Sequence, residues 1–129
     1  RLHPLLSFNK LKKISNIFKK IPKNILLSED DLNDDIEKCS SVLYRGSSAV
    51  VNAINAGLKP IYFQSFCDDL NIDPIYQLKQ GKFIVKNLDE LSIAFEKDSD
   101  LLSKQSLQDF AQNFFMPLNI DIVLKEMAD

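Results

Sequence analysis

The sequence of 129 residues is poor in the side chains that build metal sites and disulfide frameworks. It contains two cysteines, one histidine, three glycines and no tryptophan. Two cysteines without a Cys-x-x-Cys motif, beside a single histidine, supply neither a zinc site nor a disulfide framework. No run of apolar residues reaches the length of a membrane span, and no signal peptide is visible. We therefore expect no metal and no bound cofactor, reduced thiols and a cytoplasmic location.

The chain also lacks an excess of charge of either sign. Its 16 basic and 18 acidic residues give a net charge of −2, which provides no general electrostatic reason to expect nucleic acid. Lysines gather in the stretch NKLKKISNIFKKIPK, residues 9–23, beside an apolar stripe. The first interpretation of this stretch is a solvated helix face. Peripheral association with an anionic membrane, at its inner face, is the alternative.

The length suits one hydrophobic core but is small for an enzyme that closes over two substrates. A hydrophobic content of 45% and a charged content of 26% are typical of soluble globular proteins. The sequence opens on RLHP, which is typical of the trailing end of a buried strand. We therefore expect residues 1–129 to form a single domain, truncated at its N-terminus, within a longer chain.

Short apolar runs alternate with amphipathic segments along most of the sequence. Apolar residues from Phe8 to Ile21 recur at spacings of three and four, which predicts a helix over 7–20 that ends before Pro22. Further strands are predicted at 24–28, 41–46, 59–63 and 83–86, and further helices at 28–40, 47–57, 88–97, 106–115 and 120–127. This alternation predicts a doubly wound α/β fold, in which helices cover both faces of a parallel, Rossmann-like sheet and a helical tail follows.

In such sheets ligands bind beyond the carboxyl ends of the strands. The predicted topology places four stretches on that rim: His3–Pro4, Ser28–Asp30, Gly46–Ser48 and Gln64–Asp69. Residues far apart in the sequence therefore converge at one edge.

The stretch Gly46-Ser47-Ser48 opens a predicted helix directly after a strand. Free backbone N–H groups, the positive end of the helix dipole and two hydroxyl groups make such a corner a candidate anion site. Serine at the start of a helix is equally explained as a cap that needs no ligand. His3, stiffened by Pro4, is a second candidate on the same rim, where it could donate a hydrogen bond to a phosphate oxygen or carry a proton. The other interpretation is a loop histidine in solvent.

The pair RLHP and YRGSSAVVNAINAGLKPIYF resembles the donor-binding half of glycosyltransferases with two Rossmann domains, the GT-B type. It is most similar to families that use cytidine-nucleotide donors: bacterial sialyltransferases and polysialyltransferases, and teichoic-acid polymerases. Those families pair an HP motif with a Ser-Ser or Ser-Thr motif, and both bind the nucleotide phosphate. The resemblance covers about residues 1–70.

The resemblance implies roles for residues at matching positions. His3 is the implied catalytic and phosphate-binding histidine, Pro4 completes the HP motif, and Ser47 and Ser48 are the serine pair beside Gly46. Asn52 stands where many retaining members carry a ribose-binding glutamate, a departure that favours CMP- or CDP-linked sugars over UDP-linked ones.

The implied partners are a nucleotide-sugar, a glycan acceptor and the missing N-terminal domain of the parent chain, in surface polysaccharide biosynthesis. This chain offers no evident catalytic base, because its acidic residues are better explained as helix-start charges. Alone, it is expected to bind nucleotide weakly and to be inactive. Two alternatives stay open: a nucleotide-sugar epimerase domain of the same fold, and a non-catalytic α/β interaction domain.

Overall fold

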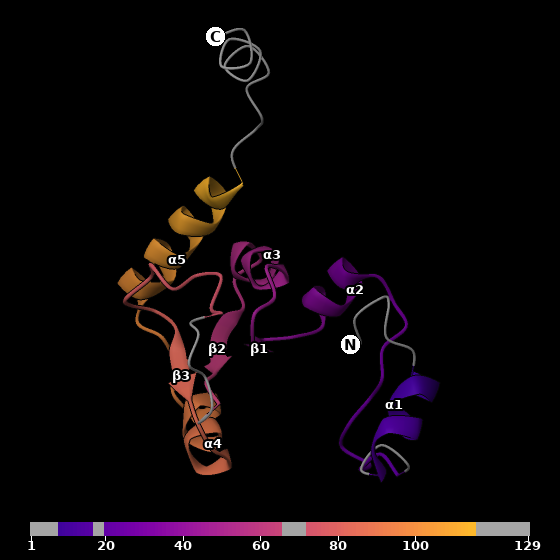
Figure 1. Ribbon diagram of the computed structural model, residues 1–129. Helices are drawn as coiled ribbons and strands as arrows, with labels where there is room; N and C mark the ends of the chain where they lie inside the picture. Colours follow the sequence, from indigo (N-terminus) through magenta and orange to yellow (C-terminus); the bar gives the residue numbers. More distant parts are fainter. Residues whose placement is uncertain (1–7, 17–19, 66–71, 116–129) are drawn as a thin grey trace, which may run out of the picture. The chain divides into compact units, whose positions relative to one another are not determined.

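The structure is a computed structural model that describes residues 8–16, 20–65 and 72–115. The chain divides into two compact units, residues 1–38 and residues 39–129. The described residues of the first unit form two short helices, and those of the second form the sheet and its helices (Figure 1).

The first unit differs from the prediction in two ways. Helix α1 (Phe8–Ile14) is shorter than the helix predicted over 7–20, because Ser15 and Asn16 follow it and such side chains compete with the helical backbone. The strand predicted at 24–28 is wrong: these residues form a turn and irregular chain. Leu26 in that segment is 88% exposed, so the apolar run has no sheet partner against which to bury itself.

Helix α2 (Leu32–Glu37) lies within the acidic stretch for which a helix was predicted. The side chain of Asp31 accepts the N–H of Asn33 at 3.0 Å and so caps the first turn. Lys38 pairs with Asp30 across 2.6 Å. Both side chains are exposed, so this ion pair contributes little to stability.

In the second unit, three apolar segments pair as a parallel sheet in the order β1-β2-β3. Strands β1 (Ser41–Tyr44), β2 (Lys59–Phe63) and β3 (Phe83–Val85) coincide with three predicted strands. Tyr44 lies opposite Tyr62, and Phe63 lies opposite Val85. The α/β class and the parallel sheet are confirmed.

Helices α3 (Ala49–Asn55), α4 (Leu88–Glu96) and α5 (Leu101–Phe114) complete the second unit. Helices α3 and α5 pack against one another beside the sheet (Figure 1). Helix α5 begins five residues before the predicted start at 106, because Asp100 caps it by accepting the N–H of Ser103 at 2.8 Å. The helix predicted at 120–127 lies outside the described residues.

Two apolar clusters use opposite faces of the sheet, since successive strand residues point to opposite sides. The larger cluster joins the sheet to α3 and α5, and its buried members are Tyr44, Val50, Val51, Ile54, Tyr62, Ile75, Leu78, Leu107 and Ala111. The smaller cluster joins Ile61 and Val85 to Ala94 of α4. Strand β2 contributes to both, with Ile61 fully buried and Tyr62 only 5% exposed.

A lysine at the start of β2 caps the C-terminal end of α4. The Nζ atom of Lys59 donates to the carbonyl oxygens of Ala94, Phe95 and Lys97 at 2.7–2.9 Å. These are carbonyl groups that the helix itself leaves unpaired, and the negative end of the helix dipole favours a cation there.

Two glycines with positive φ angles provide a matched test of packing around α5. Gly57 (φ +89°) follows α3 and Gly81 (φ +83°) precedes β3. A Cβ atom at Gly81 would lie 2.8 Å from Leu107 side-chain atoms and 3.0 Å from the carbonyl oxygen of Ser103, whereas at Gly57 the nearest atom is 3.8 Å away, on Gln108.

We predict that Gly81→Ala destabilises the protein more than Gly57→Ala. Both variants incur the cost of a left-handed backbone, about 1–2 kcal/mol. Gly81→Ala adds an overpacking cost of about 1–3 kcal/mol, because Leu107 is buried and has little room to move. Urea denaturation of both variants measures the two losses. Equal losses would contradict the close packing of the residue 81 turn against α5.

Candidate functional site

The carboxyl end of β1 leads directly into the predicted anion corner. Gly46 adopts φ +72°, a left-handed conformation that favours glycine. The corner is closely bordered by another loop, since a Cβ atom at Gly46 would lie 3.3 Å from Cδ1 of Ile72 and 3.6 Å from its carbonyl oxygen. Ser47 and Ser48 then carry the chain into α3, and both are exposed.

The two serines differ in what their hydroxyl groups do. The Oγ atom of Ser47 accepts the N–H of Ala49 at 3.3 Å, which is a cap-like bond. Ser48 occupies the capping position with helical backbone angles and makes no side-chain cap hydrogen bond. The capping explanation therefore fits Ser47, and the Ser48 hydroxyl is not used as a cap.

Asn52 lies on the exposed side of α3, one turn after Ser48. Residues four apart on a helix share a face, so Asn52 and Ser48 border the same surface. Helix α3 also buries Val50, Val51, Ala53 and Ile54, which accounts for the small and apolar residues around Asn52.

The structure describes only some of the other predicted rim residues. His3 and Pro4 lie outside the described residues, as do Asp68 and Asp69 of the predicted stretch after β2. Ser28–Asp30 were placed on the rim because a strand was predicted at 24–28; that strand is not formed, so the reason for the placement is lost. Instead the Ser28 hydroxyl donates to Asp35 within the first unit.

A buried polar network lies beside the corner and was not predicted. The hydroxyl of Tyr44, the last residue of β1, donates to Oδ1 of Asp73 at 3.1 Å. The same Oδ1 accepts the N–H of Ile75 at 3.0 Å. The ammonium of Lys82 pairs with Oδ2 of Asp73 and donates to the carbonyl oxygen of Ile75 at 2.9 Å. We call Tyr44, Asp73 and Lys82 the clasp.

The clasp is almost completely removed from solvent, with exposed side-chain fractions of 7% for Lys82 and 4% for Asp73. Burial, and next the negative charge of Asp73, raise the pKa of Tyr44 far above its ordinary value. The hydroxyl therefore stays protonated and remains a donor. Removing one partner of a buried ion pair generally costs about 3–5 kcal/mol, because the other charge is left uncompensated.

The clasp was not predicted from the sequence, because Asp73 and Lys82 lie in a stretch whose composition is typical of a polar loop. A weak signal is present: Asp73 is followed by Pro74 and Ile75 in the sequence IDPIY, and aspartate before such a turn often accepts the N–H two residues on. No sequence signal indicates that Tyr44, 29 positions earlier, supplies the second donor.

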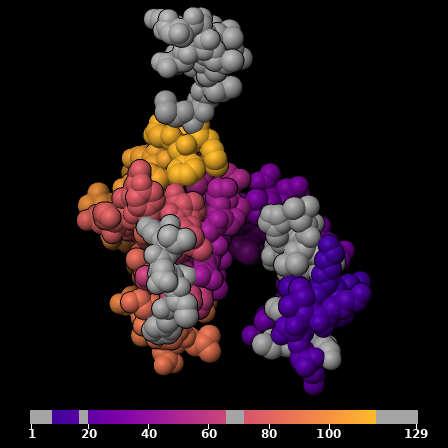
Figure 2. Space-filling model, viewed as in Figure 1, coloured from indigo at the N-terminus to yellow at the C-terminus, as the bar shows by residue number. Residues whose placement is uncertain are grey.

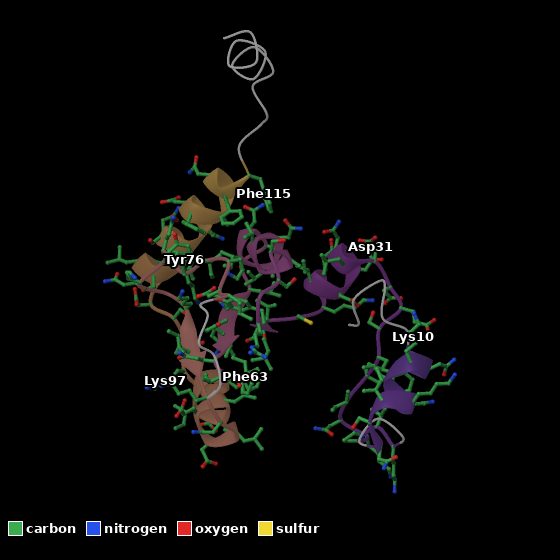
Figure 3. All side chains as sticks on the ribbon, viewed as in Figure 1. Lys10, Asp31, Phe63, Tyr76, Lys97 and Phe115 are labelled. Atoms are coloured by element: carbon green, nitrogen blue, oxygen red, sulfur yellow. The ribbon has the colours of Figure 1, made fainter. Side chains whose placement is uncertain are left out.

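Aromatic side chains can stack on a nucleotide base, but the described Tyr62, Phe63 and Tyr76 do not form one platform for it. Tyr62 is buried in the larger cluster, with its ring centroid 5.5 Å from that of Tyr44. Phe63 and Tyr76 are more exposed, at 38% and 53%. They lie well apart, with Phe63 at the end of β2 and Tyr76 near α5 (Figure 3).

A cavity of about 400 Å³ opens at the opposite end of the strands. Its lining includes Ser41 at the start of β1, Lys59 at the start of β2 and Lys104 of α5. The Lys59 ammonium is already engaged by three carbonyl groups. Because parallel sheets bind ligands beyond their carboxyl ends, this cavity is a weaker candidate than the Gly46–Ser48 corner.

Within the described ranges no group of three or more His, Cys, Asp or Glu side chains is arranged to hold a metal ion. None of the helices in that part of the chain is long and apolar enough to cross a bilayer. Comparison with protein-family models, with curated proteins and with solved structures gives no match. The function is therefore inferred from the residues and their geometry.

We predict that the two serines differ in their effect on stability. Ser47→Ala removes the bond to the Ala49 N–H and is expected to cost about 0.5–1 kcal/mol. Ser48→Ala removes an exposed hydroxyl without a capping bond and is expected to change stability by less than about 0.5 kcal/mol. Chemical denaturation of the two variants measures this difference. A larger loss for Ser48→Ala would show that its hydroxyl acts as the cap.

Proposed function

We propose that this chain is the donor-nucleotide-binding part of a glycosyltransferase, and that the Gly46–Ser48 corner binds the nucleotide phosphate. One observation carries the proposal: a glycine-serine-serine corner lies at the carboxyl end of a parallel strand, and Ser48 there has an exposed hydroxyl that is not used as a cap. Parallel α/β sheets bind ligands at this position.

The chemistry of the corner suits a phosphate. Gly46 has no side chain to hinder the approach of a ligand to the backbone. The N–H groups of Ser47 and Ser48 precede the first intrahelical donor, which is Val50, so the helix offers them no acceptor. With the Ser48 hydroxyl, these donors would stabilise the negative charge that grows on the departing nucleotide.

Three further parts of the proposal come from the sequence: the first from the resemblance, and the other two from the alternation of apolar and amphipathic segments. His3 would contact the same phosphate, the sheet would be completed as a doubly wound Rossmann-like domain, and the helical tail would continue beyond α5. A cytidine nucleotide is the favoured donor group, and a glycan is the acceptor. We place the protein in the cytoplasm, with the inner face of the membrane as the site of polysaccharide assembly.

A binding screen tests the proposal. The chain is titrated with CMP, CDP, UDP, GDP and NAD, and binding is followed by ligand-observed NMR and thermal shift. We expect CMP or CDP to bind most tightly. The double variant Ser47→Ala/Ser48→Ala is expected to weaken that binding by about 1–3 kcal/mol, the cost of leaving a charged group without its hydrogen bonds.

The matched control is Ser92→Ala/Ser106→Ala, which removes two exposed serine hydroxyls from α4 and α5. It is expected to leave nucleotide binding unchanged. A preference for UDP would keep the nucleotide site and exclude the cytidine families. If the corner variant binds as well as the control, the serines do not bind phosphate, and a non-catalytic interaction domain becomes the better explanation.

A further inference from the structure

We propose that Asp73 is a positioning residue for the Gly46–Ser48 corner. Through Tyr44 on one side and Lys82 on the other, it holds the corner in one geometry before any ligand arrives. The inference rests on the proposed function only where it assigns the corner to a nucleotide phosphate. Its mechanical part, that the clasp orders the corner, is independent of the ligand.

The first step is the attachment of the strand end. Tyr44 closes β1 two residues before Gly46, and it is only 6% exposed. Its ring packs against Tyr62 of β2, and its hydroxyl donates to Asp73. The end of β1 therefore cannot shift without breaking a buried hydrogen bond. The hydroxyl and the carboxylate would then be left unpaired, because no water reaches them.

The second step is the attachment of the loop. The Asp73 carboxylate accepts donors from three places in the chain: the Tyr44 hydroxyl, the Ile75 N–H and the Lys82 ammonium. Lys82 returns a second bond to the Ile75 carbonyl oxygen. Ile75 and Leu78 of this loop are buried in the cluster that also contains Leu107 of α5, and residues 72–82 adjoin α5 in Figure 2. The loop is thus held by both packing and charge.

The third step is the contact between this loop and the corner. Ile72, the neighbour of Asp73, closely approaches Gly46 through both its side chain and its carbonyl oxygen. The corner is therefore constrained twice by one carboxylate, along the chain through Tyr44 and across space through Ile72. A corner held in this way loses less freedom on binding an anion, which favours affinity.

A pair of hydroxyl deletions tests the inference without removing a charge. Tyr44→Phe breaks the link between the strand end and Asp73. Tyr76→Phe is the control, because it also removes one tyrosine hydroxyl, and that hydroxyl accepts a hydrogen bond from Gln77 outside the clasp. Backbone ¹⁵N relaxation reports the order of Gly46, Ser47 and Ser48 in each variant, and an NMR titration with CMP reports affinity.

We expect order parameters of about 0.85 at the corner in the wild type and in Tyr76→Phe, and values below about 0.6 in Tyr44→Phe. If the ordered corner is then populated about one tenth of the time, the Kd for CMP rises about tenfold, because affinity scales with the competent fraction.

Two results would count against these ideas, and they are distinguishable. Equal order parameters at the corner in Tyr44→Phe and Tyr76→Phe would overturn the positioning role of Asp73, whatever the affinity for CMP. Absence of CMP binding by the wild type would instead contradict the proposed cytidine-nucleotide site. In that case the order parameters alone still decide whether the clasp orders the corner.

Discussion

The pairing of β2 with a parallel strand on each side is the constraint on which the second unit depends. Because β2 is hydrogen-bonded along both edges and buried on both faces, the other strands and the helices of this unit are placed with respect to it. Ile61 anchors the cluster under α4, and Tyr62 anchors the cluster under α3 and α5. Lys59, at the start of the same strand, closes the end of α4. Side chains of this one five-residue strand thus contribute to the contacts that hold all three helices of the second unit.

The parallel arrangement also determines which chain segments meet at the carboxyl ends of the strands. The end of β1 leads into Gly46, and the long connection from β2 to β3 returns beside it through Ile72 and Asp73. A polar connection of this kind is ordinarily mobile, since loops bury few apolar groups. Here Asp73, Tyr44 and Lys82 bury their polar groups together, and every one of them has a partner.

The functional proposal follows from this arrangement. A corner that offers backbone N–H groups, a positive-φ glycine and an uncommitted serine hydroxyl lies where parallel sheets bind ligands. Capping alone accounts for Ser47 and does not account for Ser48. In the cavity at the other end of the sheet, the lining residue Lys59 is already engaged by helix carbonyls, and parallel sheets bind ligands at their carboxyl ends, so the corner remains the better site.

Much of the local structure was predictable from the sequence, because it depends on neighbours along the chain. Short apolar runs rich in β-branched and aromatic residues predicted β1, β2 and β3 within two residues, and the positive-φ Gly57 ends α3 as expected. The segment at 24–28 has a similar apolar composition and is not a strand, since a strand needs a pairing partner and no local pattern reveals whether one is present.

The sequence by itself determined the α/β class, the parallel strands and the glycine-serine corner, because these follow from periodicity and from the conformational preferences of glycine and serine. Only the tertiary structure decided that Asp73 and Lys82 are buried, that Tyr44 joins them, and that Ile72 borders Gly46. The physical reason is that a charged pair is stable inside a protein only where distant segments together supply all its hydrogen bonds. That arrangement is a property of the folded chain and not of any stretch within it.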